Sequence, residues 1–288
     1  MTMEMRAAAS AFDAIAPRFD ERFGAWLSVA AQRRAVRSVL LEGFPKGGRV
    51  VEIGGGTGED AAFLARSGYE VLLTDASPVM VDHARAKLLS SRGSAEITPA
   101  EDLELFAEKW LADGRELMDG AFSNFAPLNC VVDLEPVARG LARMLKPDAP
   151  AMLVLFGTFC PGEMITELLR MRFNQVLRRN KRGPIKARIG QREFEIVYHR
   201  KAELTAAFAP WFSLEKTVGI GVAVPPSGAE PWITGHPGLL AMLEAADRVL
   251  ARPLSMLGDH VLYQFRRNGT PGPRQLNDEL QTLAGHDR

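Results

Sequence analysis

The sequence predicts an α/β fold, a mostly parallel sheet of seven strands with helices on both faces. Two observations support this prediction. From Arg49 onward, short β-branched runs alternate with segments of helical spacing, which implies right-handed crossovers between parallel strands. A glycine cluster, Gly54–Gly58, directly follows the first run. Parallel sheets bind ligands beyond the carboxyl ends of their strands, so this cluster marks the expected ligand site.

The first half of the alternation is predicted element by element. A strand over 49–53 ends in the glycines, and a helix over 59–68 ends at Gly68. Ser77 is a plausible N-cap and Pro78 a plausible first residue for the helix that follows the second strand. The remaining elements are strands over 69–76, 95–100, 117–125 and 151–159, and helices over 77–90 and 133–147.

The alternation is flanked by a helical segment and interrupted once. Residues 160–200 break the pattern with a helix-like run over 163–180 and a hairpin expected around Gly190. The alternation resumes with helices over 201–211 and 238–251 and strands over 212–224 and 260–267. We therefore expect the following organisation: a helical cap over 1–48, a core over 49–159, an inserted segment over 160–200, completion of the sheet over 201–267 and a polar tail over 268–288.

Composition restricts the class of protein. The chain has 288 residues, enough for one large domain with an insertion. Lys+Arg and Asp+Glu both number 35, so a global attraction to nucleic acid or to a membrane is not indicated. The two cysteines, Cys130 and Cys160, lack metal-ligand spacing and are interpreted as small buried residues of a protein in a reducing compartment. No apolar run is long enough to span a bilayer, so we expect a cytoplasmic protein. We expect no bound metal either.

The glycine cluster does not match the dinucleotide fingerprint G-x-G-x-x-G. Counting from Gly54 and Gly56, the third glycine position is occupied by Glu59. A carboxylate at the start of a helix competes with a pyrophosphate for the same helix dipole. The sequence therefore disfavours a dinucleotide oxidoreductase and favours a ligand without phosphates at this loop.

The spacing Glu52-x-Gly54-x-Gly56-x-Gly58 resembles the first motif of class I S-adenosylmethionine-dependent methyltransferases. Three later stretches resemble that family in the same order: "LLTDASPVM" with its Asp75, "AED" after the third strand, and "DGAFSNFAPLNCV" followed by "PVARGLARMLKPDAPAMLV". The resemblance covers about 49–160 closely and 200–267 loosely. It implies a Rossmann-like fold, S-adenosyl-L-methionine as the cofactor and methyl transfer as the activity.

The resemblance also implies cofactor-binding roles. Glu52 would bind the methionine amine directly or through water, and Asp75 would hold the ribose hydroxyls. Pro99 stands where many relatives have an aspartate, so either Glu101 or Asp102 would meet the adenine amine. The other expected contacts are Gly54 and Gly56 beside the sulfonium, Ala76 on the adenine, Asn124 along the methionine portion and Phe19, with Phe12, as cover.

The methyl acceptor is less defined by the sequence. His199 is the best histidine for a general base, although a packing role is an alternative. Nine basic residues and no acidic ones lie between Arg170 and Arg192, which is either a solvated face or a lid for an anionic substrate or an acidic carrier protein. We expect the acceptor to be a small-molecule biosynthetic intermediate that is methylated on O, N or C. The alternatives are an RNA or protein methyltransferase, or a cofactor-binding scaffold without catalysis.

Overall fold

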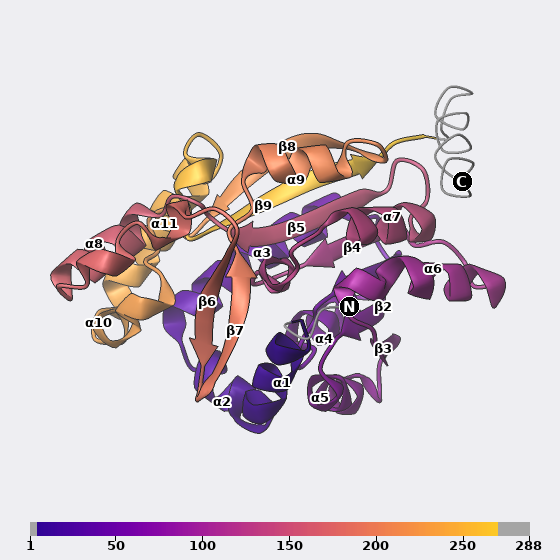
Figure 1. Ribbon diagram of the computed structural model, residues 1–288, viewed down its shortest axis with the longest axis horizontal. Coiled ribbons are helices and arrows are strands. Elements are labelled where there is room, and N and C mark those ends of the chain that lie inside the picture. Colours follow the sequence, from indigo (N-terminus) through magenta and orange to yellow (C-terminus); the bar gives the residue numbers. More distant parts are fainter. Residues whose placement is uncertain (1–4, 270–288) are drawn as a thin grey trace, which may run out of the picture.

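The computed structural model describes residues 5–269, so most of the predicted polar tail lies outside the described residues. A seven-stranded sheet forms the centre, with the strand order β3-β2-β1-β4-β5-β9-β8 (Figure 1). The first five strands run parallel, and β9 is antiparallel to both of its neighbours. The strands are β1 (Arg49–Ile53), β2 (Glu70–Asp75), β3 (Gly93–Ile97), β4 (Gly120–Ser123), β5 (Pro150–Phe156), β8 (Phe212–Ile220) and β9 (His260–Arg267). The predicted α/β fold is confirmed.

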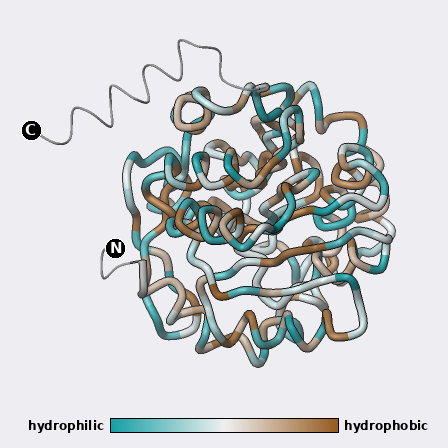
Figure 2. Tube along the Cα trace, turned by 90° about the vertical axis from the view of Figure 1, so that its right-hand side faces the viewer, coloured by the Kyte–Doolittle hydropathy of each residue, from teal (hydrophilic) through white to brown (hydrophobic). Residues whose placement is uncertain are grey.

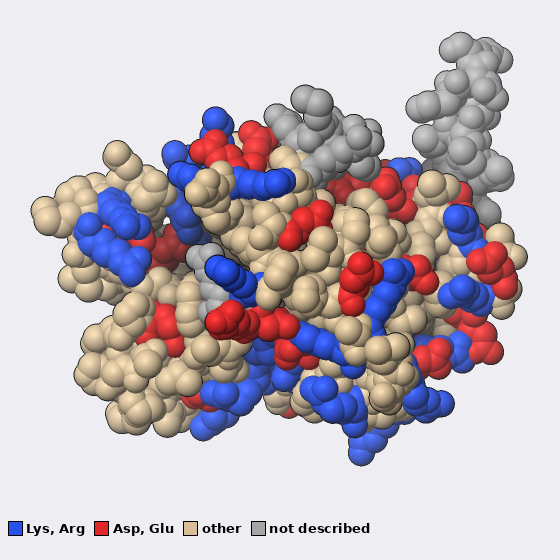
Figure 3. Space-filling model, turned by 90° about the horizontal axis from the view of Figure 1, so that it is seen from below, with Lys and Arg blue, Asp and Glu red and all other residues tan. Residues whose placement is uncertain are grey.

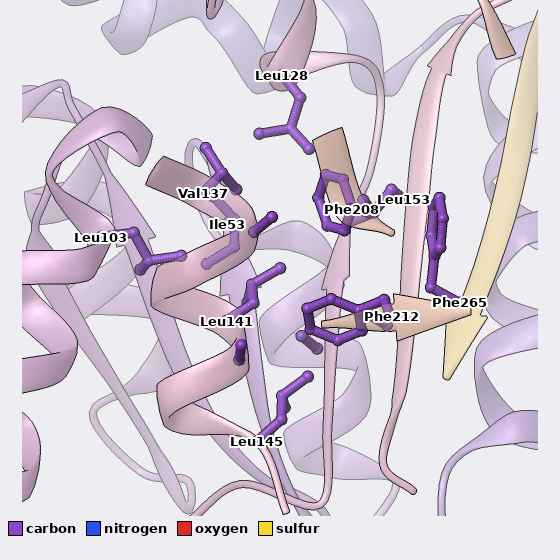
Figure 4. Packing of buried hydrophobic residues seen from close by; sticks show 14 of the residues in the cluster. Ile53, Leu103, Leu128, Val137, Leu141, Leu145, Leu153, Phe208, Phe212 and Phe265 are labelled. Atoms are coloured by element: carbon purple, nitrogen blue, oxygen red, sulfur yellow. The ribbon is translucent and has the colours of Figure 1, made fainter. Parts of the chain in front are cut away.

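Helices cover both faces of this sheet. One face packs against α3 (Leu27–Gly43), α4 (Glu59–Arg66) and α5 (Pro78–Leu88). The other packs against α6 (Leu103–Ala112), α7 (Glu135–Met144) and α9 (Lys201–Phe208). Figure 4 shows the second core, where Leu103 and Leu141 from the helices approach Ile53, and the rings of Phe208 and Phe265 stack 4.9 Å apart. Along the chain, hydrophobic stretches run through the middle of the molecule (Figure 2).

Local chemistry explains where the site-forming elements begin. The Ser77 side chain accepts a hydrogen bond from the Met80 amide at 3.1 Å, and Pro78 is the first residue of α5, as predicted. Gly58 enters α4 with a φ of +80°, a conformation that favours glycine. Both helices therefore start immediately beyond the carboxyl ends of strands β1 and β2.

Two predictions about helices need correction. The prediction omitted α6, although Leu103, Phe106, Ala107 and Trp110 form one stripe that faces the core. The apolar residues Leu105 and Leu111 on the exposed side obscure this stripe in the sequence. The helix expected over 163–180 is instead α8 (Pro161–Leu169) followed by two short 3-10 turns. It ends because Met171 adopts a φ of +56°, which cannot continue an α-helix.

The remaining elements lie over the carboxyl edge of the sheet. The predicted hairpin is present as β6 (Pro184–Ile189) and β7 (Arg192–Val197), with Gly190 at a φ of +59° in the turn. The first helix, α1 (Met5–Ile15), packs on this hairpin through Ala8 and Ala11. The other helices near the edge are α2 (Phe19–Gly24), α10 (Glu230–Thr234) and α11 (Pro237–Leu250). Within residues 5–269, no helix combines the length and apolar character needed to cross a bilayer.

Candidate functional site

A cavity of about 760 Å³ lies at the carboxyl edge of the sheet, within the size range of small-molecule sites. We divide it into two parts. The loop half is lined by the loops that follow β1, β2, β3 and β4. The roof half is lined by α1, α2, α3, the inserted segment 160–200 and the residues at the start of β9. The cofactor-binding residues predicted from the sequence belong to the loop half, apart from Phe19 in the roof half and Asp102, which does not line the cavity.

The glycines after β1 have separate roles. Gly54 has a φ of +67°, and a Cβ there would lie 2.3 Å from the Pro127 Cβ, so this glycine lets two loops pack closely. Gly56 has a φ of +56°, and the space where its Cβ would stand is open. Both residues line the cavity. Gly56 is therefore the position where backbone is exposed to a ligand, whereas the need for glycine at Gly54 comes from packing against Pro127.

Asp75, at the end of β2, is fixed by the glycine loop. One carboxylate oxygen accepts a hydrogen bond from the Gly56 amide at 2.8 Å, and the other accepts one from the Ser77 amide at 2.9 Å. Burial raises the pKa of Asp75, and the nearby Asp13 raises it further. Each oxygen keeps a lone pair for another donor, and Ala76 lines the cavity beside it. The carboxylate is thus positioned to accept a pair of hydroxyls.

Glu52 is the least satisfied acid of the loop half. It is buried, and its Oε2 has no hydrogen-bond partner among the described residues. Burial raises the pKa of Glu52 well above its usual value, and the neighbouring Asp60 and Asp75 act in the same direction. A bound cation would relieve this unpaired acid. The amine and sulfonium of S-adenosylmethionine are such charges, so the residues present fit this cofactor.

The loops after β3 and β4 complete the loop half. Glu101 lines the cavity, and burial raises its pKa, whereas Asp102 is not part of the lining. The structure thus separates the two acids between which the sequence could not choose. Asn124 lines the cavity too, but its amide already donates to Asp60 at 2.8 Å, and its carbonyl oxygen accepts from the Phe125 amide at 2.8 Å. Asn124 therefore orders the loop as well as facing the ligand space.

The N-terminal helices close over the loop half. Phe19 lines the cavity, with its ring centroid 4.8 Å from that of Phe23 and 6.4 Å from that of Phe12. Asp20 attaches α2 to the glycine loop, because it accepts hydrogen bonds from Thr57 at 2.5 Å and from Lys87 at 2.6 Å. Phe19 is therefore held above the loop half by a polar contact next to it in the chain.

The structure places His260, and not the predicted His199, in the cavity lining. His199 does not line the cavity; its Nε2 lies 2.8 Å from the Val131 carbonyl oxygen, and its side chain is buried elsewhere. His260 does line the cavity, stacked on Phe156 at 4.8 Å. Because β9 runs antiparallel to β5, its first residue reaches the carboxyl edge of the sheet. Only the strand direction, which is not apparent in local sequence, places His260 there.

The basic run of the inserted segment is compensated by acids that lie outside it. Glu163 pairs with Arg178 at 2.7 Å and also with Arg179. Arg179 pairs in addition with Asp259 at 2.6 Å. Figure 3 shows acidic and basic side chains interspersed on one face of the molecule. The positive charge of this run is therefore partly compensated within the fold, at Arg178 and Arg179 by Glu163.

Neither thiol catalysis nor metal chemistry finds support in the cavity among residues 5–269. Cys130 lines it, but burial raises the pKa of this thiol to about 12, so it is not a nucleophile at neutral pH. Cys160, the other free thiol, is also buried with a raised pKa, as the sequence suggested for a small buried residue. Across residues 5–269, no cluster of His, Cys, Asp and Glu side chains is arranged to hold a metal ion.

Comparison with known proteins agrees with this geometry. Residues 50–148 match the family model described as a methyltransferase domain. A structure of an S-adenosylmethionine-dependent methyltransferase from Methanosarcina mazei is 17% identical, with a TM-score of 0.53 over 81% of this chain and 98% of that one. The DhpI–SAH complex is 17% identical, with a TM-score of 0.53 over 93% and 98%. The [4+2]-cyclase SpnF is 16% identical, with a TM-score of 0.52 over 82% of each chain. No curated protein matches the sequence.

These structural likenesses show the fold, and the domain match adds a methyltransferase domain over residues 50–148. Strands β1 to β4, the glycine loop and Asp75 lie within or beside the matched residues 50–148. The unpaired Glu52 supplies the acidic environment that a sulfonium cofactor needs. The chain therefore carries a methyltransferase domain over residues 50–148, within a fold shared with S-adenosylmethionine-dependent methyltransferases, and S-adenosyl-L-methionine is its cofactor.

Proposed function

We propose that this enzyme methylates an O, N or C nucleophile of a small molecule bound in the roof half of the cavity. The observation that carries the proposal is the composition of that half. Aromatic rings line it from four parts of the chain: Phe23 and Trp26 near α2, Phe156 at the end of β5, Phe194 on β7 and Tyr198 after it. Such walls suit a compact, partly apolar molecule.

The arrangement assigns simple tasks to the protein. S-adenosylmethionine supplies a methyl group that is already activated for transfer. The chain then has to hold the acceptor in line with this group and keep water out, and most of the rate would come from that alignment. Helix α1 and the β6–β7 hairpin, packed together through Ala8, Ala11 and Phe194, would provide the cover. In this proposal, the inserted segment 160–200 is the lid of the acceptor site.

A small acceptor is better supported than RNA or a protein. A nucleic-acid site needs a basic stripe on one face, whereas two of the three arginines of the inserted segment that border the cavity, Arg178 and Arg179, are paired with Glu163. The third, Arg188, lines the cavity without an ion pair within residues 5–269. Lys181 and Arg182 are exposed and form no ion pair within residues 5–269. They would be the contacts for an anionic group or for an acidic carrier protein that delivers the acceptor.

The proposal is tested by a metabolite screen. The enzyme is incubated with S-adenosylmethionine and cell extract separated into metabolite, RNA and protein fractions, and the products are examined by mass spectrometry. We expect a metabolite that gains the mass of one methyl group, and no gain with Asp75→Ala protein at low cofactor concentration. Methyl transfer only into the RNA or protein fraction would contradict a small-molecule acceptor.

A further inference from the structure

Two histidines of this chain are equally buried, each 6% exposed, but their surroundings differ. The Nε2 of His199 is occupied by the Val131 carbonyl oxygen. In His260, Nδ1 is buried without a hydrogen-bond partner and lies 3.5 Å from Asp259 Oδ2. Its Nε2 has no hydrogen-bond partner in the described part of the chain either. Because His260 lines the cavity, Nε2 is the nitrogen left for a bound molecule.

The ring of His260 is held in one orientation. It stacks on Phe156 with centroids 4.8 Å apart, and its edge meets the ring of Phe125 at 5.6 Å and an interplanar angle of 88°. Phe125 follows β4 with a φ of +57°, and the guanidinium of Arg33 lies over its ring, 4.8 Å from the centroid. The imidazole thus stands above the ends of β4 and β5, at the boundary between the loop half and the roof half.

The charges around His260 favour a neutral imidazole that can still take up a proton. Burial lowers its pKa; Asp259 and Glu163 oppose this effect, whereas Arg179 adds to it. The elements that supply Phe156 and Phe125 present rings, with Arg33 behind the second ring. Asp259 is itself held by Arg179 at 2.6 Å and by Gln32 at 3.2 Å. A fixed carboxylate beside Nδ1 would stabilise the imidazolium.

We propose that His260 is the general base of this enzyme and that the acceptor presents a hydroxyl of phenol or enol type. This inference rests on the proposed function. His260 Nε2 takes the hydroxyl proton while the oxygen forms a bond to the methyl carbon and the carbon–sulfur bond breaks, with its electron pair remaining on sulfur. The imidazolium then releases the proton to water. The net products are a methyl ether or enol ether, the demethylated cofactor and one proton.

The test compares His260→Gln with the matched control His199→Gln, using the acceptor found in the metabolite screen. General base catalysis contributes about 10²–10⁴-fold, so we expect turnover by His260→Gln to fall by that factor and turnover by His199→Gln to change little. The wild-type rate should fall only below about pH 6.5, the ordinary pKa of histidine, because the pKa of His260 is lowered. The rate of His260→Gln should instead keep rising with pH, as the acceptor loses its proton unaided.

A second readout does not depend on turnover. In protein with ¹⁵N-labelled histidine and bound demethylated cofactor, adding the acceptor should shift the Nε2 resonance of His260 and leave that of His199 in place. Calorimetry should give both variants the wild-type affinity for the demethylated cofactor. Wild-type protein that methylates no metabolite contradicts the proposed function itself. An active wild type with an equally active His260→Gln, or with an unshifted His260 resonance, overturns this inference alone.

Discussion

The two halves of the cavity are built in different ways. The loop half comes from four successive strand ends between Glu52 and Pro127, so its parts are close in the chain. The roof half combines α1, α3, the inserted segment and the start of β9, and its central contact joins Arg179 to Asp259 across 80 residues. A site made of consecutive loops leaves a motif in the sequence. A site assembled from distant segments is recognised only once the chain is folded.

The halves also differ in their acids. In the loop half, burial raises the pKa of Glu52, Asp75 and Glu101, and Glu52 has an unpaired oxygen. In the roof half, arginines lower the pKa of Glu163, and His260 followed by Arg179 lowers the pKa of Asp259, in spite of burial. The loop half is therefore electrostatically incomplete without a cationic ligand, whereas the roof half is held together by its own charges.

The largest effect should follow from breaking the buried charges of the roof half. Arg179 is 7% exposed and holds Glu163 and Asp259, so Arg179→Met leaves the buried Asp259 without its arginine and Glu163 with Arg178 alone. We expect the free energy of unfolding to fall by about 3–5 kcal/mol in urea denaturation. Arg178→Met is the matched control, because Arg178 is 43% exposed on the same Glu163 and should cost about 1 kcal/mol or less. Equal losses in both variants would contradict this account of the roof half.

In the loop half, the expected effect is on binding. Asp75→Ala should weaken the affinity for S-adenosylmethionine by about 1.5–3 kcal/mol, the range for hydrogen bonds to a charged group. Part of this loss would come from the Gly56 amide, which loses its acceptor. Asp82→Ala, an exposed acid on α5, is the control. If calorimetry gave Asp75→Ala the same dissociation constant as wild type, Asp75 would not be a ligand of the cofactor.

Substitution of Glu52 should stabilise the ligand-free protein, in contrast to substitution of Arg179. Its pKa is raised in the folded protein, so the ligand-free protein loses stability as the pH rises from the ordinary value near 4.5 through the folded pKa. Glu52→Gln should therefore be more stable than wild type at pH 7, by about 1–3 kcal/mol, and bind the cofactor more weakly. The gain should vanish at about pH 4, where both side chains are neutral. Thermal unfolding against pH measures it, with Glu70→Gln as an exposed control; a gain independent of pH would exclude this cause.

A smaller difference should separate two neighbouring acids. Glu101 lines the cavity and Asp102 does not. Glu101→Ala should weaken cofactor binding by about 0.5–1.5 kcal/mol, typical of one hydrogen bond, and Asp102→Ala should leave it unchanged. Calorimetry on the two variants decides this point. A larger loss in Asp102→Ala would mean that the adenine lies elsewhere.

The smallest effect concerns the exposed charges of the inserted segment. Lys181→Glu with Arg182→Glu should raise the KM for an anionic or carrier-bound acceptor a few-fold, most clearly at low salt, and leave cofactor affinity unchanged. Arg178 and Arg179 are unsuitable for this test because they hold Glu163. Reversing Lys46 and Arg92, which precede β1 and β3 at the opposite edge of the sheet, is the control. An unchanged KM and salt response would mean that the basic residues between Arg170 and Arg192 form only a solvated face.

The same contrast explains how much could be predicted from the sequence. The alternation of strands and helices, the glycine loop and the position of Asp75 depend on periodicity and spacing within about one turn or loop, and the structure has them as predicted. The close contact of Gly54 with Pro127, the separation of Glu101 from Asp102 and the pairing of Arg179 are tertiary properties. Chain order does not tell which edge of the sheet a histidine reaches, so the sequence favoured His199, whereas the antiparallel β9 brings His260 to the cavity.

The most direct test of the central claim is a calorimetric titration of the wild-type protein with S-adenosylmethionine and, separately, with NAD. The claim is that Glu52, Gly56 and Asp75 form a site for a cationic, phosphate-free cofactor. It predicts saturable binding of S-adenosylmethionine at one site per chain and no detectable heat of binding for NAD. Tight binding of NAD without binding of S-adenosylmethionine would contradict it.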